Sequence, residues 1–484
     1  MNRTELLARA EEWIAVHRKE YIAELQGIAR IPSVSRADLA QPGAPFGPDC
    51  RRVLDYALAR GRHYGFDAVD HDGYAGSVTW GDTDNSIGVI AHLDVVPVGD
   101  GWVYPPFGAT YLPEHDVLVG RGVDDNKSAF VAGLFAMRML REFGVPMRHG
   151  VRLICGTSEE TGMQDMQALR RMGHRFPGTS LVPDAGFPVN YAQKGMVDGA
   201  IVIPCEGNLL QLDAGSVGNV IPDEAACVVA VDMEKARAAM DCADAADASM
   251  IEITPTEGGV RITAKGKSGH AAFPAGGDNA IGRLARVLTA VGLLEGSARS
   301  AMAALADLTR DANGISEGVA YADEPSGELT LVYGVAHLKD GTLTVSVDCR
   351  YPVTMNGAAL EADLRKVWAD RGFAVKEFDL SEPFYIPVDD PRVTALMSLY
   401  KDVTGRDDPP YAMGGGTYSR AVPGAISFGP GMPGAQRDYS AFLPEGHGGA
   451  HGRDEVLPIE KMLTCSKIYV AALAELDGIV DTEA

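Results

Sequence analysis

Three short and almost continuous apolar runs constrain the fold of this chain more than any other feature of its sequence. The runs are residues 86–91 (SIGVIA), 151–155 (VRLIC) and 180–182 (SLV), and a helical pattern at 128–143 lies between the first two. Strands that are buried on both faces of a parallel sheet are apolar along their whole length, and crossover helices join parallel neighbours. The order of strand, helix and strand therefore predicts an α/β fold with parallel strands.

The pattern changes at about Gly195 and changes back after Pro383. Between these positions, apolar and polar residues alternate at 209–214, 226–231, 251–263 and 329–347. Such alternation is typical of antiparallel strands with one covered face. The chain of 484 residues is long enough for two or three domains. We therefore predict a discontinuous α/β domain, residues 1–192 and 383–484, interrupted by an inserted α+β domain, residues 193–382.

Helical spacing of apolar residues predicts the remaining elements. It indicates a long amphipathic helix at 5–30, which ends before Pro32, and a long closing helix at 457–476. Further helices are predicted at 236–248, 279–294, 297–310, 358–371 and 392–403.

The charge of the chain excludes several classes of partner. There are 43 Lys+Arg against 66 Asp+Glu, which gives a formal net charge of −23, and no basic run occurs. Nucleic acids and anionic membrane surfaces are bound through Lys and Arg, so neither is an expected partner. No apolar stretch reaches the roughly 18 residues of a membrane span, and the N-terminal segment lacks the apolar centre of a signal peptide. These features predict a cytoplasmic protein.

The cysteines point to the same compartment. The seven cysteines are scattered along the chain and never form a CxxC pair. This spacing predicts reduced, mostly buried thiols rather than a disulfide framework or a thiolate zinc site.

Polar residues that can bind metal follow each of the apolar runs or precede the helix between them. They are His92 and Asp94, Asp125 in the glycine-rich turn GRGVDDNKS, Glu159 and Glu160, and Asp184. Ligands of open α/β sheets bind at the carboxyl ends of the strands, so these side chains are expected to converge on one crevice. Imidazole and several carboxylates without a thiolate suit a hydrolytic zinc, manganese or cobalt site, and the surplus of carboxylates suits two ions.

Each of these residues also has a simpler explanation. A single histidine after a strand is often a hydrogen-bonded core residue, and a Glu pair is usually solvated surface. Asp124 and Asp125 could cap the helix that begins near Ser128. If these motifs did not bind metal, however, they would together place several charges beside a buried sheet edge. Buried charges are costly unless they are paired or bind metal, so the metal site is favoured.

Several strings resemble one enzyme family. The strings are AHLDVVPVGDGW (91–102), GRGVDDNKSA (120–129), GTSEETG (156–162) and VPDAGFP (182–188), followed by GNVIPDEA (218–225), SGHAAFPAGGDNA (268–280), VDCRYP (347–352) and GGGTYSRAVPG (414–424). They resemble the co-catalytic metal exopeptidases that include aminoacylase, carboxypeptidase G and dipeptidases of the PepV type, and the last two point most towards the PepV branch. The resemblance spans nearly the whole chain. It implies an α/β catalytic domain, with a mixed sheet flanked by helices, that is interrupted by an α+β lid domain.

The resemblance also implies a role for each candidate metal ligand. His92 and Asp184 would hold a first metal ion, Glu160 and His451 a second, and Asp125 would bridge the two. Zinc is the expected ion, with manganese or cobalt as alternatives.

Other residues near these ligands would assist catalysis. Glu159 would be the general base, and Asp94 would orient the imidazole of His92 by accepting its other N–H; a role of Asp94 as a turn former stays open. His451 is preferred to His447 as a ligand, although the string GAHGRDE departs from the AHQPNE-like string of close relatives at Gly452, Arg453 and Asp454. Ser128 and Gln193 also depart from the family pattern.

In the inserted domain, Asn219, His270 and Arg350 match residues that bind substrate in the family. Arg can hold a carboxylate in a bidentate manner, and His or Asn can donate to a developing oxyanion. The backbone N–H groups of Gly415, Gly416 and Thr417 would add contacts to a carboxylate. A surface salt bridge for Arg350 and an ordinary tight turn for the glycines are the alternatives.

The resemblance implies metal-dependent hydrolysis of dipeptides with free amino and carboxyl termini. Asp184 favours this substrate class, because carboxypeptidases and acylases of the family tend to carry Glu at that position. An N-acyl-amino-acid deacylase or carboxypeptidase on the same scaffold is the first alternative, and a non-catalytic binding protein is the second. A nucleotide-binding enzyme is disfavoured because no GxGxxG follows the first strand and no phosphate-binding GKS or GKT occurs. The long insertion favours a monomer, and a dimer stays open.

Overall fold

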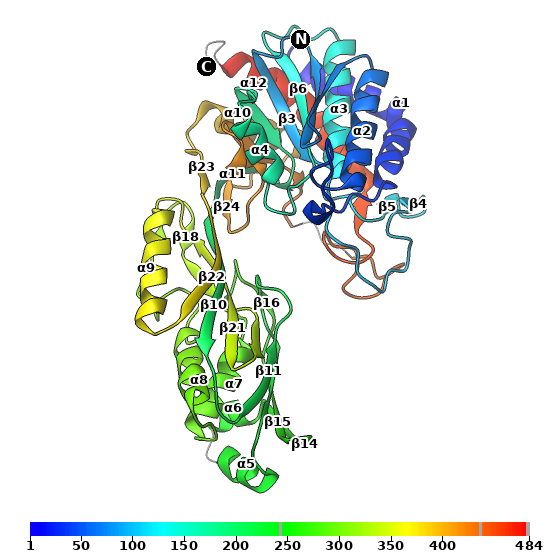
Figure 1. The fold of residues 1–484 in the computed structure, drawn as a ribbon. Coiled ribbons are helices and arrows are strands. Elements are labelled where there is room, and N and C mark those ends of the chain that lie inside the picture. Colours follow the sequence, from blue (N-terminus) through cyan, green and yellow to red (C-terminus); the bar gives the residue numbers. More distant parts are fainter. Residues whose placement is uncertain (242–243, 435–437, 481–484) are drawn as a thin grey trace. The chain divides into compact units, whose positions relative to one another are not determined.

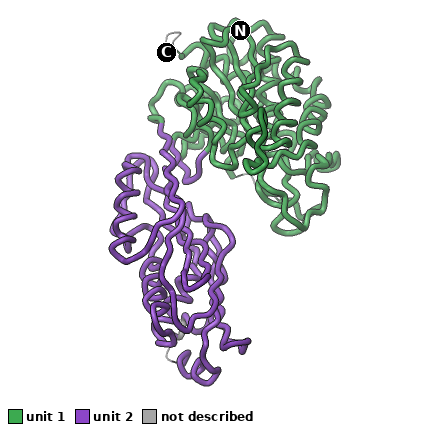
Figure 2. Tube along the Cα trace, in the orientation of Figure 1, with its two compact units in different colours: residues 1–191, 386–411, 417–484 green, residues 192–385, 412–416 purple. Residues whose placement is uncertain are grey.

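The structure is a computed structural model, and it describes residues 1–241, 244–434 and 438–480. The chain divides into two compact units (Figure 2). Unit 1 comprises Met1–Tyr191, Ile386–Tyr411 and Thr417–Ala484, and unit 2 comprises Ala192–Tyr385 and Ala412–Gly416. The short segment Ala412–Gly416, which the sequence pattern assigns to the last part of the α/β domain, thus groups with unit 2.

Unit 1 is built on a mixed sheet, of which Figure 1 labels β3 and β6. Its strand order is β1-β2-β6-β3-β7-β25-β9. Its strands are β1 (Asp67–His71), β2 (Ala75–Trp80), β3 (Ser86–His92), β6 (Gly150–Gly156), β7 (Thr179–Val182), β9 (Val189–Gln193) and β25 (Ala425–Phe428). β3 is parallel to β6 and β7, and β25 is parallel to β7. The outer strands β1, β2 and β9 pair in the antiparallel direction. The three apolar runs therefore lie side by side as parallel strands, as predicted.

Helices cover both faces of this sheet, which explains why every residue of β3 and β6 is buried. Successive side chains of a strand point to opposite faces. On one face, Gly133 of α3 (Lys127–Glu142) lies against Val89 and Leu153. On the other face, Ile90 and Ile154 belong to a core cluster with residues of α4 (Gln164–Arg171) and α11 (Tyr418–Ala421).

The other helices of unit 1 are α1 (Arg3–Ala29), α2 (Pro48–His63), α10 (Pro391–Thr404) and α12 (Ile459–Ile479), together with the short 3-10 helix Ala37–Leu39. α12 packs on α1, α3 and α10. Smaller strands are β4 (Thr110–Leu112), β5 (Val117–Val119) and β27 (Val456–Pro458), which form one sheet, and the pair β8 (Ala185–Gly186) and β26 (Pro430–Gly431). The predicted first and last helices thus agree with α1 and α12 to within three residues at each end.

Unit 2 contains an antiparallel sheet with strand order β14-β15-β13-β11-β20-β21-β10-β22. Its strands are β10 (Gly195–Pro204), β11 (Leu209–Ala214), β13 (Glu224–Val229), β14 (Ile251–Thr256), β15 (Gly259–Lys265), β19 (Thr330–Val332), β20 (Ala336–Lys339), β21 (Thr342–Tyr351) and β22 (Ala374–Ser381). The predicted stretch 251–263 is a hairpin, because the chain turns at Glu257 and Gly258, and Gly258 has a φ of 82°. The stretch 329–347 likewise contains β19, β20 and most of β21.

The helices α7 (Ala280–Ala290), α8 (Ser297–Leu308) and α9 (Gly357–Asp370) bury apolar residues in one core with this sheet. The predicted helix 236–248 corresponds to α5 (Met233–Met240) and α6 (Ala245–Ala248), with residues 242–243 outside the described part of the chain. Short strands complete the unit: β12 (Val220–Ile221), β16 (Gly269–His270), β17 (Ala322–Asp323), β18 (Gly327–Glu328) and β23 (Phe384–Tyr385), with β24 (Tyr411–Met413) at the unit boundary.

The six described cysteines are free and buried, and Cys242 lies outside the described residues. Among the helices that the structure describes, none combines the length and the apolar character that crossing a lipid bilayer requires.

Candidate metal centre

Seven of the sequence-predicted residues gather in unit 1, at the carboxyl ends of the central strands. His92 ends β3, the pair Glu159 and Glu160 follows β6, and Asp184 follows β7. Because these strands are parallel neighbours, their carboxyl ends meet at one edge of the sheet. Asp94 follows β3, Asp125 precedes α3, and His451 lies in the loop before β27.

Asp125 lies between two histidines. Its Oδ1 atom is 3.0 Å from Nε2 of His92, and its Oδ2 atom is 3.1 Å from Nε2 of His451. Nε2 of His92 also lies 3.6 Å from Oδ1 of Asp184, and Nε2 of His451 lies 2.9 Å from Oε1 of Glu160. The two carboxylate oxygens of Asp125 thus face two different histidines.

The ligand atoms lie close enough to share metal ions. Among the described residues, two groups have potential ligand atoms within 4.8 Å of one another: His92, Asp125 and Glu160 form one, and His92, Glu159 and Asp184 form the other. Glu159 therefore lies as close to the first set of ligands as a ligand would, although the family resemblance implies that it is the base.

Buried negative charge dominates this cluster. Burial and the nearby carboxylate of Asp184 raise the pKa of Glu159 well above its usual range. Burial also raises the pKa values of Glu160 and Asp184. Hydrogen bonds to Asp125 and Glu160 raise the pKa of His451 to about 10. Carboxylates crowded together away from water require compensating positive charge, and oxygen and imidazole ligands suit divalent cations. The donor set therefore fits the metal ions that the sequence predicts.

A comparison with known protein families agrees with this geometry. The family described as Peptidase family M20/M25/M40 matches residues 88–475. This chain belongs to that family. It is therefore a metallopeptidase, a class of enzyme that uses divalent metal ions, and the buried cluster of this M20-family chain is the candidate site for them.

Individual relatives cover nearly the whole length of the M20-family chain. A Bacillus subtilis protein named "Putative dipeptidase YtjP" is 30% identical over 472 residues, which are 95% of this chain and 97% of that protein. Two solved structures show the same fold. Dug1p, a di-peptidase from Saccharomyces cerevisiae, has a TM-score of 0.58 at 13% identity, covering 99% of each chain. Human carnosine dipeptidase 1 has a TM-score of 0.56 at 17% identity, covering 98% of this chain and 99% of that one.

Two main-chain arrangements hold the ligands of β3 and β6. Nδ1 of His92 lies 2.9 Å from the backbone carbonyl of Asp94, which leaves Nε2 to face the cluster, while the nearest carboxylate oxygen of Asp94 is 3.5 Å from Nδ1. Both the main-chain carbonyl and the carboxylate of Asp94 therefore lie beside Nδ1 of His92, and the carbonyl is the nearer of the two. The carboxylate also accepts the backbone N–H groups of Glu159 and Glu160, each at 3.1 Å.

Asp165 is a site residue that the sequence pattern did not indicate. Its fully buried Oδ2 accepts the backbone N–H groups of Thr157 and Ser158 at 2.7 and 2.9 Å, and it also accepts the hydroxyl of Tyr418. Together, Asp94 and Asp165 bind all four backbone N–H groups from Thr157 to Glu160. Asp165 lies on α4, inside an ordinary amphipathic pattern, so nothing local distinguishes it from a surface carboxylate.

The two histidines of the last loop have different environments. His447 Nδ1 lies 2.6 Å from Asp454, whose buried carboxylate also accepts the backbone N–H groups of Val103 and Tyr104. The structure thus places His451, rather than His447, against the predicted metal ligands. The residue after Asp454, Glu455, was also missed from the sequence; it is fully buried and accepts backbone N–H groups of the turn that carries Asp125.

Unit 2 brings together three of the predicted substrate-binding residues and part of the glycine turn. β12 pairs with β16, and the carbonyl of Asn219 accepts the N–H of Ala271, so Asn219 adjoins His270. Arg350 on β21 forms two hydrogen bonds with Asp348, at 2.9 and 3.0 Å, and donates to the carbonyl of Gly414 at 2.9 Å. A Cβ atom at Gly414 would lie 2.6 Å from that of Ala272, so this turn requires glycine to approach the His270 segment.

The structure shows what the side chains of Arg350 and Thr417 contact. Both Arg350 and Asp348 are buried, so this ion pair is not a surface salt bridge. The side chain of Thr417 caps α11 by accepting the N–H of Ser419 and contacts Ser427 at 2.8 Å. Gly415 and Gly416 belong to unit 2, whereas Thr417 begins the last segment of unit 1.

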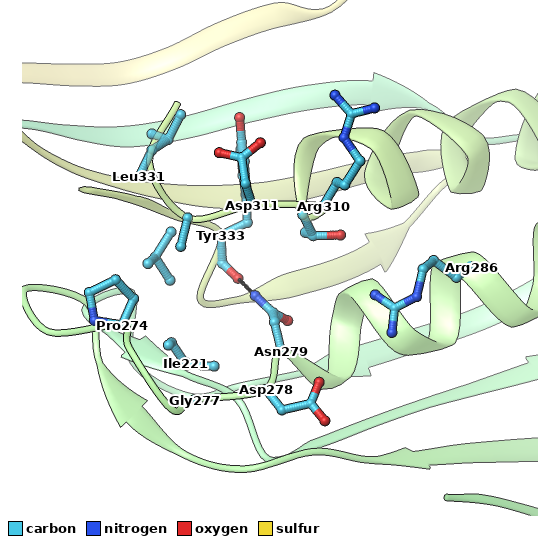
Figure 3. A pocket seen from close by; sticks show the side chains of 13 residues that line it. Ile221, Pro274, Gly277, Asp278, Asn279, Arg286, Arg310, Asp311, Leu331 and Tyr333 are labelled. Carbon is cyan, nitrogen blue, oxygen red and sulfur yellow. Dashed lines mark hydrogen bonds between the residues drawn. The ribbon is translucent and has the colours of Figure 1, made fainter. Parts of the chain in front are cut away.

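A cavity of about 240 Å³ in unit 2 contains none of the predicted residues (Figure 3). Its polar lining residues already have partners. Asn279 caps α7 and donates to the carbonyl of Tyr333, and Arg286 pairs with Asp247. Asp311 accepts three backbone N–H groups of its own loop. This cavity therefore does not compete with the buried cluster of unit 1 as the catalytic site.

Proposed function

We propose that this protein is a dipeptidase that hydrolyses dipeptides with free amino and carboxyl termini, using two divalent metal ions. The main observation behind the proposal is that one carboxylate oxygen of Asp125 faces His92 and the other faces His451. Glu159 lies in the same buried cluster. The relative that is 30% identical over almost the whole chain is itself named as a dipeptidase, which supports the substrate class.

The proposed ligands form two sets around Asp125. His92 and Asp184 would hold the first ion, Glu160 and His451 would hold the second, and Asp125 would bridge them. When bound, such ions polarise the scissile carbonyl and lower the pKa of the attacking water towards neutrality. Zinc is the proposed ion, and manganese and cobalt suit the same ligands.

Glu159 is the proposed general base. Its carboxylate lies in the same cluster as His92 and Asp184, where it could take a proton from the attacking water and then pass this proton to the leaving amine. The carboxylate of a general base must keep one orientation during both proton transfers. Asp94 holds the backbone of Glu159, and Asp165 holds the two residues before it.

His270 is the proposed donor to the oxyanion. Its Nδ1 accepts the backbone N–H of Ala272 at 3.0 Å, so the proton of the neutral ring is on Nε2. Burial and the guanidinium of Arg350 lower the pKa of His270, which keeps the ring neutral. A neutral imidazole with a free N–H can donate to the developing negative charge.

Arg350 is the proposed anchor for the substrate carboxylate. Asp348 and Gly414 occupy three of its five N–H donors, and the remaining two can bind a carboxylate. Asn219 and the backbone of Gly415, Gly416 and Thr417 would add polar contacts. We further propose that the enzyme works in the cytoplasm as a monomer, and that nucleic acids and membranes are not its partners.

The decisive experiment compares one dipeptide in its free, N-acetylated and C-amidated forms, with products separated by chromatography. Each form is assayed with a chelator and again after zinc or manganese is added. Metal-dependent cleavage of the free form alone supports the proposal. Preference for the N-acetylated form would instead identify a deacylase or carboxypeptidase, and no cleavage of any form would favour a binding protein.

A further inference from the structure

One buried ion pair, between Glu455 and Arg121, contacts the turn that carries Asp125 and the loop that carries His451, two of the proposed ligands of the second metal ion. We propose that Glu455, acting with Arg121, is a positioning residue that sets the distance between Asp125 and His451 and thereby the affinity of the second site. The inference rests on the proposed two-metal function. Neither Glu455 nor Arg121 is itself a proposed ligand; their proposed role is to position two of the ligands.

Both carboxylate oxygens of Glu455 accept hydrogen bonds from the turn before α3. Oε1 accepts the backbone N–H groups of Asp124 and Asp125 at 2.8 and 2.9 Å. Oε2 accepts the N–H of Gly122 at 3.1 Å and Nη1 of Arg121 at 2.9 Å. The side chain is 0% exposed, so water does not compete for these bonds. Glu455 therefore holds the main chain of the bridging ligand directly.

Arg121 extends the same contact to the other ligand. Its Nη2 donates to the backbone carbonyl of His451 at 3.1 Å. The guanidinium is buried and lies over the ring of Trp102, 5.2 Å from its centroid. Because a guanidinium is planar and rigid, its contacts with Glu455 and with His451 keep a constant separation. Arg121 and His451 are 330 positions apart in the sequence, so this hydrogen bond connects two distant loops.

The two proposed metal sites depend on this pair to different degrees. His92 ends β3 and Asp184 follows β7, so the hydrogen bonds of the central sheet hold the first pair of ligands. His451 instead lies in a loop outside any helix or strand, has a positive φ of 60°, and keeps a side chain that is 56% exposed. Loss of the ion pair should therefore weaken the second site more than the first.

Asp477 offers a matched control. It is also a buried carboxylate, and it accepts the backbone N–H groups of Arg148 and His149 and contacts the His149 ring. None of these residues belongs to a loop with a proposed ligand. A purely structural effect of removing a buried carboxylate should therefore appear equally in Asp477→Asn and Glu455→Gln.

The test is calorimetric titration of zinc into chelator-stripped wild type, Glu455→Gln, Arg121→Lys and Asp477→Asn. Arg121→Lys keeps the charge beside Glu455 but loses the planar fork that also reaches His451, so it remains informative if Glu455→Gln does not fold. We expect the second zinc to bind about 10- to 100-fold more weakly in the Glu455 and Arg121 variants, with a much smaller loss of affinity for the first zinc. Asp477→Asn should bind both ions like wild type, and excess zinc should restore kcat in Arg121→Lys at an unchanged KM.

Two other results would overturn the inference in distinguishable ways. If wild type binds two ions and Arg121→Lys binds both with unchanged affinity, or loses both equally, the pair does not position the second site. If wild type binds fewer than two ions, the two-metal function itself is wrong, and the positioning role falls with it.

Discussion

Nε2 of His92 lies 3.0 Å from Oδ1 of Asp125, although the two residues are 33 positions apart and belong to different elements. His92 ends a central strand, and Asp125 lies in the turn before the helix that packs on that strand. The second oxygen of Asp125 faces His451, so one carboxylate links a ligand on the sheet to a ligand on a loop.

Replacing Glu159 with Gln should abolish most turnover and leave metal binding intact. Gln has nearly the same shape but cannot accept the proton of the attacking water, and general base catalysis contributes about 10²- to 10⁴-fold to a rate. Steady-state kinetics and metal analysis of the same preparation provide the measurement. A variant that loses its metal and keeps an appreciable rate would show that Glu159 is a ligand, as its proximity to His92 and Asp184 would allow.

His451→Ala and His447→Ala should have different effects. His451 contacts Asp125 and Glu160, so its removal should lower the bound metal from two ions per chain to one. His447 contacts Asp454, so its removal should cost about 1 kcal/mol of stability and leave the metal content unchanged. Metal analysis and thermal unfolding of the two variants measure both effects. Equal metal loss in the two would contradict the assignment of His451.

A chelator should remove activity and lower the melting temperature, and added zinc should restore both. Buried carboxylates with raised pKa values repel one another when no cation is bound, and a ligand that binds only the folded state stabilises it. Thermal unfolding at several free zinc concentrations measures this linkage. A melting temperature that does not depend on zinc would argue against metal binding in this cluster.

Arg350→Lys should raise KM for free dipeptides about 10-fold and have little effect on C-amidated ones. Lys keeps a positive charge beside Asp348 but lacks the planar fork that binds a carboxylate in a bidentate manner. The difference between the two substrate forms is the relevant measurement. An equal increase in KM for both would mean that Arg350 serves the fold of unit 2 and not the substrate carboxylate.

Glu317 should make unit 2 less stable as pH rises. Burial raises the pKa of Glu317 to about 7, although its carboxylate accepts the hydroxyl of Tyr333 at 2.7 Å. The folded state therefore holds the proton more tightly than the unfolded state, whose pKa is about 4.3. Stability is greatest below the unfolded pKa and falls as pH rises towards 7.

Glu317→Gln removes this titration and provides the measurement. Between pH 5.5 and 8.5, the free energy of unfolding of wild type should fall by about 2 kcal/mol relative to the variant. Urea unfolding at each pH tests this, and parallel curves for the two proteins would contradict it.

The sequence by itself determined the central strands, the long helices and the residues that follow the strands. β3 and β6 are buried on both faces, so their apolar composition is a local signal that needs no knowledge of the partner elements. Parallel neighbours must end at the same sheet edge, which is why the order of the strands alone predicts that His92, Glu160 and Asp184 converge. Helical periodicity is equally local, and α1 and α12 follow it.

Only the tertiary structure decided how these residues are held and which histidine joins them. His447 and His451 are four residues apart in one glycine-rich loop, so their local sequences do not distinguish them, and the folded loop turns one to Asp454 and the other to Asp125. Arg121 and Glu455 act through hydrogen bonds to backbone groups 330 and 331 positions away, and Asp165 acts through hydrogen bonds to the backbone of Thr157 and Ser158. Any buried carboxylate or guanidinium can form such bonds, so they leave no periodic pattern in the sequence, and only folding brings the partners together.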